Sequence, residues 1–95
     1  MTKAIKFKKW NCLIEKGKYN NGRIALSFVN KRNGEDIIVA TVNIPEVRIA
    51  KDEVIIKNYS ENEGVLEILM QAGIISEPVR SIETVFVTFP ICKLL

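Results

Sequence analysis

Residues 53–64 read Glu53-Val54-Ile55-Ile56-Lys57-Asn58-Tyr59-Ser60-Glu61-Asn62-Glu63-Gly64. The first four residues are typical of a buried strand, and the others form the only long polar run that leads straight into a helix pattern. A junction of this kind carries functional side chains more often than the framework does, because a loop holds reactive groups where a ligand can reach them. This junction is therefore the first candidate for a functional site.

The helix that follows the junction is expected over residues 65–72. Its apolar side chains recur at core spacing, and Gly73 ends it. Ser60 and Glu63 fit a capping box, in which each side chain satisfies a free backbone amide of the first turn. Gly64 would then lie in the first helical turn, where alanine would be more stable by roughly 0.5–1 kcal/mol. A glycine at that position predicts the close approach of another part of the chain or of a partner.

Alternating apolar residues predict three strands before the junction. The first is expected over residues 4–15, with a bulge at Lys8-Lys9 because the parity of its apolar residues changes there. The second and third strands, over residues 23–30 and 36–44, flank Asn33-Gly34, which is the best short hairpin signal in the chain. These two strands are predicted to form an antiparallel hairpin.

The last strand is expected over residues 82–89, and Pro90 is expected to end it because proline cannot donate to a strand ladder. With a further strand near residues 53–56, the chain is predicted to adopt an α+β fold. The expected architecture is an antiparallel sheet of about five strands with one helix packed on one face. A partly open barrel is the alternative arrangement of these strands. All 95 residues, 1–95, are expected to form a single domain.

The composition excludes several classes of chemistry. The chain has no histidine and only two cysteines, Cys12 and Cys92. Without histidine it lacks the commonest general base, and two cysteines fall short of a zinc site. The acidic pairs Glu35-Asp36 and Asp52-Glu53 are expected to be solvated loop charges. We therefore expect a protein that is not an enzyme and uses no metal or cofactor. Its thiols are expected to be buried or half-buried, with a disulfide or a reactive thiol as the alternatives.

The sequence also bears on location and assembly. No apolar run reaches the length of a membrane helix, and the N-terminal residues lack the apolar stretch of a secretory signal. A cytoplasmic protein without a membrane partner is the expectation. An exposed edge of the predicted sheet could pair with a second copy, so the sequence is compatible with a homodimer.

Positive charge is concentrated in the first third of the chain. Residues 1–34 carry nine Lys or Arg and one acidic residue, a net charge of +8. Residues 35–95 carry five basic and ten acidic residues, a net charge of −5. Lysines that protect sheet edges from pairing are one explanation. A basic face that binds nucleic acid or an acidic protein is the other.

Nucleic-acid binding would use the basic residues of the first strand and of the turn after it, namely Lys6, Lys8, Lys9, Lys16 and Lys18. Trp10 lies among these lysines, and proteins that bind single strands combine a basic groove with stacking aromatic rings. Trp10 also suits the core, and in that case the lysines would only face solvent.

Protein binding would instead use the junction. Asn58, Tyr59 and Asn62 are the side chains expected to form a contact surface, with Arg23 beside them. The alternative is that the junction only caps the helix, because its own serine and glutamates already occupy the free amides at the helix start.

Five segments of the chain carry a resemblance to a known family. They are Lys18-Tyr19, residues 21–26 (Asn-Gly-Arg-Ile-Ala-Leu), residues 40–45 (Ala-Thr-Val-Asn-Ile-Pro), residues 52–64 and the ending 90–94 (Pro-Ile-Cys-Lys-Leu). The most specific part is Tyr-Ser-Glu-Asn-Glu-Gly at 59–64. The chain resembles a small uncharacterised domain family of Gram-positive and gut bacteria, often carried on plasmids, conjugative elements and phages. The resemblance covers nearly the whole chain and brings no catalytic residues.

The resemblance implies an accessory protein of a mobile element. Such proteins often bind host or element proteins, and some blunt host defences by blocking a nuclease. The resulting expectation is a non-enzymatic accessory protein that acts by protein–protein binding on a protein partner. A nucleic-acid-binding accessory factor that uses the basic first strand is the alternative.

Overall fold

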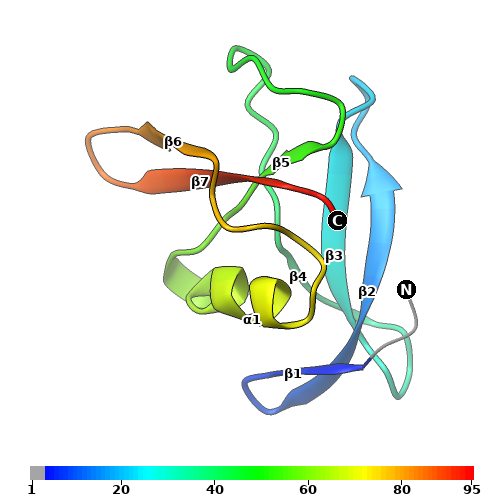
Figure 1. The fold of residues 1–95 in the computed structure, drawn as a ribbon. Coiled ribbons are helices and arrows are strands. Elements are labelled where there is room, and N and C mark those ends of the chain that lie inside the picture. Colours follow the sequence, from blue (N-terminus) through cyan, green and yellow to red (C-terminus); the bar gives the residue numbers. More distant parts are fainter. Residues whose placement is uncertain (1–3) are drawn as a thin grey trace.

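Two antiparallel sheets and one short helix form the computed structural model, which describes residues 4–95 (Figure 1). The first sheet has the order β1–β2–β3–β4, formed by Ile5–Phe7, Trp10–Lys18, Ile24–Asn30 and Asp36–Val39. The second has the order β5–β7–β6, formed by Glu53–Ile55, Thr88–Lys93 and Arg80–Glu83. A 3₁₀ turn η1, Ser60–Asn62, precedes the helix α1, Val65–Gln71. The α+β class agrees with the prediction. The single sheet of about five strands is wrong, and the sheets of the described residues do not close into a barrel.

The predicted first strand is in fact two strands. β1 and β2 form a hairpin in which Phe7 lies opposite Trp10 and Ile5 opposite Cys12, so that Lys8-Lys9 is the turn. A two-residue turn shifts the parity of the apolar residues as a bulge does, so the sequence pattern alone does not separate the two. Lys8 takes the left-handed backbone conformation, with φ 54°. The expected bulge is therefore a chain reversal.

The predicted hairpin of the second and third strands is confirmed as β3 and β4. Its turn contains Gly34 at φ 77°, a conformation that favours glycine, and the Gly34 amide donates to the Asn30 carbonyl at 2.7 Å. β4 ends at Val39 rather than at residue 44, because the chain leaves the first sheet there and Thr41 pairs with Ile56 next to β5. The segment after β4 thus connects the two sheets.

The predicted last strand also consists of two strands. β6 and β7 form a hairpin in which Glu83 lies opposite Thr88. Figure 1 shows this hairpin projecting from the body of the molecule. Pro90, predicted to end a strand, lies inside β7, and its carbonyl accepts a hydrogen bond from the Ile56 amide at 2.9 Å. Its missing N–H is tolerated because it lies where the ladder with β5 stops.

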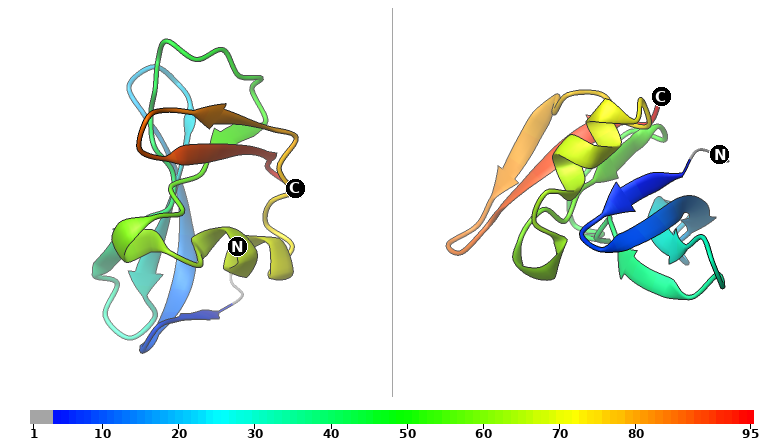
Figure 2. Two further views of the ribbon diagram at one scale, coloured as in Figure 1. Left: turned by 90° about the vertical axis from the view of Figure 1, so that its left-hand side faces the viewer. Right: turned by 90° about the horizontal axis from the view of Figure 1, so that it is seen from below.

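One core lies between the two sheets and the helix (Figure 2). Its buried residues are Phe7, Cys12, Ile14, Leu26, Phe28, Ala40, Val54, Ile56, Val65, Leu69, Ile74, Ile75 and Cys92. Trp10 is half-buried and packs against this core. Both cysteines are free and buried, as predicted. A smaller cluster of Ile55, Phe89 and Ile91 covers the opposite face of the second sheet, because side chains alternate between the faces of a strand.

The start of α1 differs from the predicted capping box. Ser60 has φ 58° and begins the 3₁₀ turn, and the residue before α1 is Gly64, which has no side chain to cap it. Asn58 supplies the acceptor instead, since its Oδ1 accepts a hydrogen bond from the Leu66 amide at 2.9 Å. Gly64 has φ 95°, and a Cβ there would meet no atom within 4 Å. Its backbone conformation, rather than a close approach, therefore favours glycine.

Candidate functional site

Two side chains of the predicted contact surface serve the fold. Asn58 is half-buried and holds the start of α1. Asn62 is 1% exposed, and its Nδ2 donates a hydrogen bond to the Val39 carbonyl at 2.7 Å. This bond ties η1 to the end of β4, so the Asn62 side chain offers a partner almost no surface. The sequence could not indicate this, because the carbonyl that Asn62 satisfies is 23 residues away.

Tyr59 is half-buried and anchors the junction to the second sheet. Its ring packs edge-to-face on Phe89 of β7, with 5.7 Å between the ring centroids. The Lys57 ammonium lies 5.5 Å from the centre of the Tyr59 ring and 3.1 Å from the Glu61 carboxylate. A backbone amide hydrogen bond, followed by the bond to Lys57, lowers the pKa of Glu61 to about 2. Through its contact with Phe89, Tyr59 lies against β7 of the β6–β7 hairpin.

Arg23 braces a loop. Its Nη1 donates to the Ile44 carbonyl at 2.8 Å, and its Nη2 donates to the Val47 carbonyl. Ile44, Val47 and Tyr59 all pack against the small cluster of Ile55, Phe89 and Ile91. Arg23 is thus connected with Tyr59 through this cluster. The guanidinium itself donates its hydrogen bonds to backbone carbonyls.

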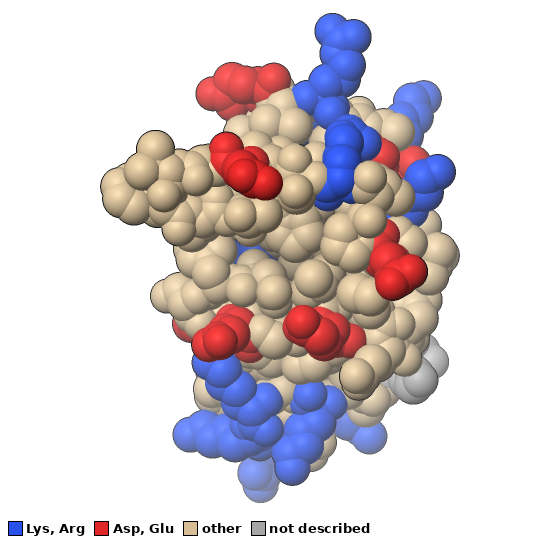
Figure 3. Space-filling view, turned by 60° about the vertical axis from the view of Figure 1, so that its left-hand side comes forward, with Lys and Arg blue, Asp and Glu red and all other residues tan. Residues whose placement is uncertain are grey.

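Lys6, Lys8 and Lys9 are exposed and lie on β1 and in the turn after it. The Lys8 Nζ donates to the Glu61 carbonyl at 3.0 Å, and the Lys9 Nζ lies 5.3 Å from the centre of the Trp10 ring. Figure 3 shows Lys and Arg side chains gathered at the lower end of the molecule, where this turn lies. Lys6 is on an edge strand, where a lysine also prevents pairing with other chains.

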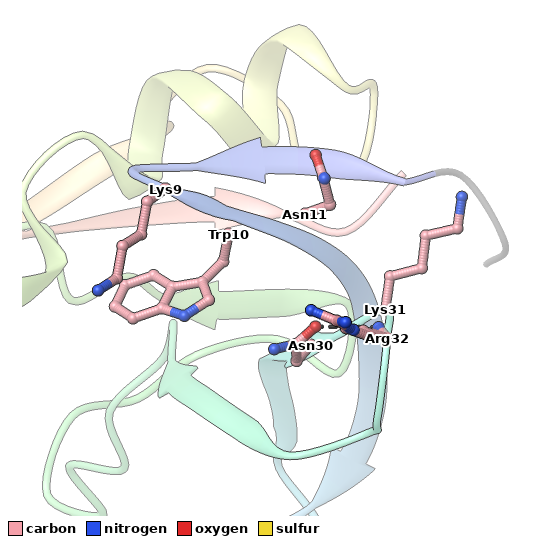
Figure 4. Close-up of a pocket in the computed structure, with 6 residues that line it drawn as sticks. All are labelled: Lys9, Trp10, Asn11, Asn30, Lys31 and Arg32. Carbon is pink, nitrogen blue, oxygen red and sulfur yellow. Dashed lines mark hydrogen bonds between the residues drawn. The ribbon is translucent and has the colours of Figure 1, made fainter.

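A cavity of about 390 Å³ opens beside Trp10 (Figure 4). It is lined by Lys9, Trp10, Asn11, Asn30, Lys31 and Arg32, none of which is acidic. Lys31 and Arg32 are not among the residues predicted from the sequence. They reach the cavity because they follow β3, and the Lys31 amide donates to the Asn11 carbonyl at 2.9 Å. The pairing of β2 with β3 is the signal that could have found them, since Asn30 lies opposite Cys12.

Exposed apolar side chains form the tip of the β6–β7 hairpin. Val85 is 91% exposed and Phe86 is 92% exposed. Figure 3 shows the hairpin as an arm whose end carries no charged side chain. Sequence reasoning missed this site because alternating apolar residues predict a strand that faces a core, and no glycine, asparagine or proline marks the turn between Thr84 and Val87.

An ion pair between buried Glu53 and exposed Arg80 connects β5 with β6. Glu53 is 6% exposed, so the prediction that it is a solvated loop charge is wrong. Its carboxylate accepts two hydrogen bonds from Arg80, each of 2.9 Å, and one from the Ala50 amide at 2.8 Å. Arg80, and then the Ala50 amide, hold the pKa of Glu53 below its ordinary value. These bonds link β5 with β6, the two outer strands of the second sheet.

Neither thiol is activated for chemistry. Cys12 and Cys92 are buried, and burial raises the pKa of both, that of Cys92 to about 11. A thiol with a raised pKa is a poor nucleophile at neutral pH. Within the described part of the chain, no group of three or more His, Cys, Asp or Glu could hold a metal ion. The cavity beside Trp10 and the hairpin tip are the surfaces from which function can be argued.

No protein-family model, curated protein or solved structure matches the chain. Between residues 4 and 95, no helix is long and apolar enough to cross a membrane. The resemblance noted in the sequence therefore stays a prediction, and the function has to be inferred from the geometry of the exposed surfaces.

Proposed function

We propose that the chain is a non-enzymatic binding protein that holds another protein through the tip of its β6–β7 hairpin. The observation that carries the proposal is the exposure of Val85 and Phe86, at 91% and 92%. Burying such a side chain stabilises a complex by roughly 1.5–3 kcal/mol. Two adjacent apolar side chains at the end of an arm therefore suit an apolar pocket on a partner.

The chemistry of the turn supports this proposal. Val85 and Phe86 are the two central residues of a turn closed by a hydrogen bond of 2.9 Å from the Thr84 amide to the Val87 carbonyl. Tight turns prefer Gly, Asn or Asp at such positions. A sequence that departs from a local preference without a compensating contact in the fold often does so at a functional site.

The tip is also held in a fixed shape before any partner binds. The Thr84 Oγ1 accepts hydrogen bonds from the Val87 amide at 3.1 Å and the Phe86 amide at 3.4 Å. A segment that is ordered before binding loses less entropy when the complex forms. The hairpin thus presents Phe86 on an ordered backbone turn, and aromatic side chains are enriched among the residues that dominate binding energy.

The charge of the hairpin favours a protein partner over a lipid surface. Residues 81–92 contain one charged residue, Glu83, and no Lys or Arg. Anionic membranes attract clusters of Lys and Arg, whereas an acidic residue next to an apolar tip is repelled. A protein pocket with a basic rim matches both features.

The contact surface predicted from the sequence includes Tyr59, which lies against the β6–β7 hairpin. Tyr59 packs on Phe89, and Val87 and Ile82 belong to the same small cluster. A partner that enclosed the hairpin would reach Tyr59 next. The resemblance to accessory proteins of mobile elements suggests where to look for it, among the proteins of the host bacterium or of the element, including defence nucleases.

The test is affinity capture followed by reconstitution with the purified partner. The tagged chain is incubated with lysate of the bacterium that carries it, with and without nuclease treatment. A partner protein that the wild type captures even after nuclease treatment should no longer be captured by the double variant Phe86→Ala with Val85→Ala. The affinity of this variant for the purified partner should fall about tenfold or more. Val79→Ala combined with Leu95→Ala is the matched control, because these residues are 47% and 71% exposed but lie outside the tip.

Equal binding of the two double variants would contradict the hairpin as the site. Tyr59→Ala and Arg23→Glu then test whether the contact extends to the junction. Circular dichroism of each variant shows that the fold is retained.

A further inference from the structure

We propose that the cavity beside Trp10 binds single-stranded nucleic acid, with a base stacked on the indole ring and backbone phosphates held by Lys9, Lys31 and Arg32. This site lies on the first sheet and is independent of the β6–β7 hairpin. Figure 4 shows Trp10 between Lys9 on one side and the segment of Asn30 and Arg32 on the other. A volume of about 390 Å³ lies within the range of small-ligand pockets.

Trp10 is positioned so that it serves the core and the cavity together. It lies opposite Phe7 in the β1–β2 hairpin and packs against the core, yet it is only half-buried. The Lys9 ammonium lies 5.3 Å from its ring centre, which favours a fixed ring orientation. The part of the indole that lines the cavity is thus a preformed aromatic surface.

The two other cations are placed by backbone hydrogen bonds. The Lys31 amide donates to the Asn11 carbonyl at 2.9 Å, and the Arg32 amide donates to the Asn30 Oδ1 at 2.9 Å. These bonds fix the turn after β3 next to the strand end that carries Trp10. The fold therefore brings the turn that carries Lys31 and Arg32 to the cavity that Trp10 lines, although Lys31 and Lys9 lie far apart in the sequence.

The three cations are not neutralised by neighbouring carboxylates. For residues 4–95 the ion pairs are Lys57–Glu61 and Arg80–Glu53, and neither involves a residue of the cavity. None of the lining residues is acidic. The lining therefore offers an anionic ligand one aromatic ring and three cations that form no ion pair within residues 4–95, the combination of basic groove and stacking ring that single-strand binders use.

Edge protection does not explain this arrangement. It accounts for Lys6 on the edge strand β1, but Lys31 and Arg32 lie in a turn and have no strand edge to protect. A duplex would use the charges and leave the indole unused, because its paired bases are stacked inside the helix, and an acidic peptide offers carboxylates but no nucleobase to stack on the indole. A single strand offers both phosphates and an accessible base face.

Trp10 is the only tryptophan of the chain, so its fluorescence reports directly on the cavity. Oligo(dT) of about 12 nucleotides is titrated into the full chain at salt concentrations from about 50 to about 200 mM. We expect saturable quenching of Trp10, and an affinity that falls with salt with a slope of about −2 for three phosphate contacts on a single strand.

A pair of charge-matched variants makes the test specific. Lys31→Gln with Arg32→Gln should weaken binding about tenfold or more at low salt. Lys16→Gln with Lys18→Gln removes the same charge, but about 20–26 Å from Trp10 along β2. This control should bind within about twofold of the wild type. Trp10→Leu, measured with a fluorescently labelled oligonucleotide, should also lose about tenfold, because stacking on one aromatic ring carries much of the affinity.

Three outcomes would overturn the proposal. One is binding without quenching of Trp10, and a second is equal weakening by the two charge-matched variants. The third is equal quenching by a duplex or by poly-glutamate, which would make the cavity a general anion site. Phe86→Ala should bind the oligonucleotide like the wild type, so that failure here is distinguished from failure of the hairpin proposal.

Discussion

Asn58 performs the task that the sequence pattern assigns to Ser60. Its Oδ1 accepts a hydrogen bond from the Leu66 amide, whereas Ser60 lies in the 3₁₀ turn at φ 58°. The helix has only the seven residues Val65–Gln71, and the bond from Asn58 satisfies one of the backbone amides at its start that have no partner within the helix.

Replacing Asn58 should therefore destabilise the protein where replacing Ser60 does not. Asn58→Ala is expected to lower the free energy of unfolding by about 1 kcal/mol, the usual effect of losing a helix cap. Asn58→Asp keeps the acceptor and should recover most of this loss. Ser60→Ala should stay within about 0.5 kcal/mol of the wild type. Urea denaturation measures the free energy of unfolding of all three variants. A larger loss for Ser60→Ala than for Asn58→Ala would show that Ser60, and not Asn58, caps the helix.

Glu53 makes the stability depend on pH. Because Arg80 holds the pKa of Glu53 below its ordinary value of 4.5, the charged form is favoured in the folded state. The contribution of charged Glu53 to the free energy of unfolding is complete above the pKa that Glu53 has in the unfolded chain. It is lost as the pH falls through the lower pKa that Glu53 has in the folded chain. The relevant window therefore lies below about pH 4.5.

Glu53→Gln should remove this contribution. At neutral pH we expect it to lower the free energy of unfolding by about 1.5–3 kcal/mol, the range for hydrogen bonds to charged groups. The difference from the wild type should shrink as the pH falls below about 4.5. Denaturant unfolding at a series of pH values measures it, and a difference that stays constant with pH would show that the loss comes from packing alone.

At the scale of elements, the β1–β2 turn carries strain that the sequence does not reveal. Lys8 adopts φ 54°, a conformation that costs a non-glycine residue roughly 1–2 kcal/mol. Lys8→Gly should therefore raise the free energy of unfolding by about 0.5–1 kcal/mol, even though the hydrogen bond to the Glu61 carbonyl is lost. Lys9→Gly is the control and should lower it. Thermal denaturation of both variants measures these changes. A lower stability of Lys8→Gly would contradict the positive φ of Lys8 in the β1–β2 turn.

The β6–β7 hairpin depends on Thr84 for the shape of its tip. The Thr84 hydroxyl accepts from the Val87 amide and donates to the Val87 carbonyl at 2.9 Å. Thr84→Ala should speed hydrogen exchange of the Val87 amide several-fold while amides in β2 and β3 keep their rates, because the opening is local. Thr84→Ser retains the hydroxyl and should behave like the wild type. Uniform acceleration over both sheets would mean that the hairpin is not an independent unit.

At the scale of the whole molecule, the two sheets share one core and should unfold together. Cys12 reports on the first sheet and Cys92 on the second, and both are buried in the same cluster. Their alkylation in increasing urea, followed by mass spectrometry, should show the same midpoint as Trp10 fluorescence. Cooperative unfolding is usual for single domains of this size. Earlier labelling of Cys92 would show that the second sheet opens separately.

Local patterns were sufficient for part of the structure. The alternation of apolar residues around Asn33-Gly34 predicted the β3–β4 hairpin, and the helical spacing after Gly64 predicted α1. Both signals lie within a short window, where backbone conformation and side-chain period act on neighbouring residues. The burial of the two thiols also followed from composition and context. The turn at Lys8-Lys9 and the turn at Val85-Phe86 did not, because neither has the residues that mark turns.

The candidate sites depended on contacts that no local pattern contains. Buried Asn62 has its partner at Val39 and buried Glu53 has its partner at Arg80, across 23 and 27 residues of chain. The sequence established the basic first third, the lone tryptophan and the absence of histidine. Only the folding of two sheets onto one core placed Lys31 and Arg32 beside Trp10 and left Phe86 in solvent, because burial is set by which strands meet and not by the period of each strand.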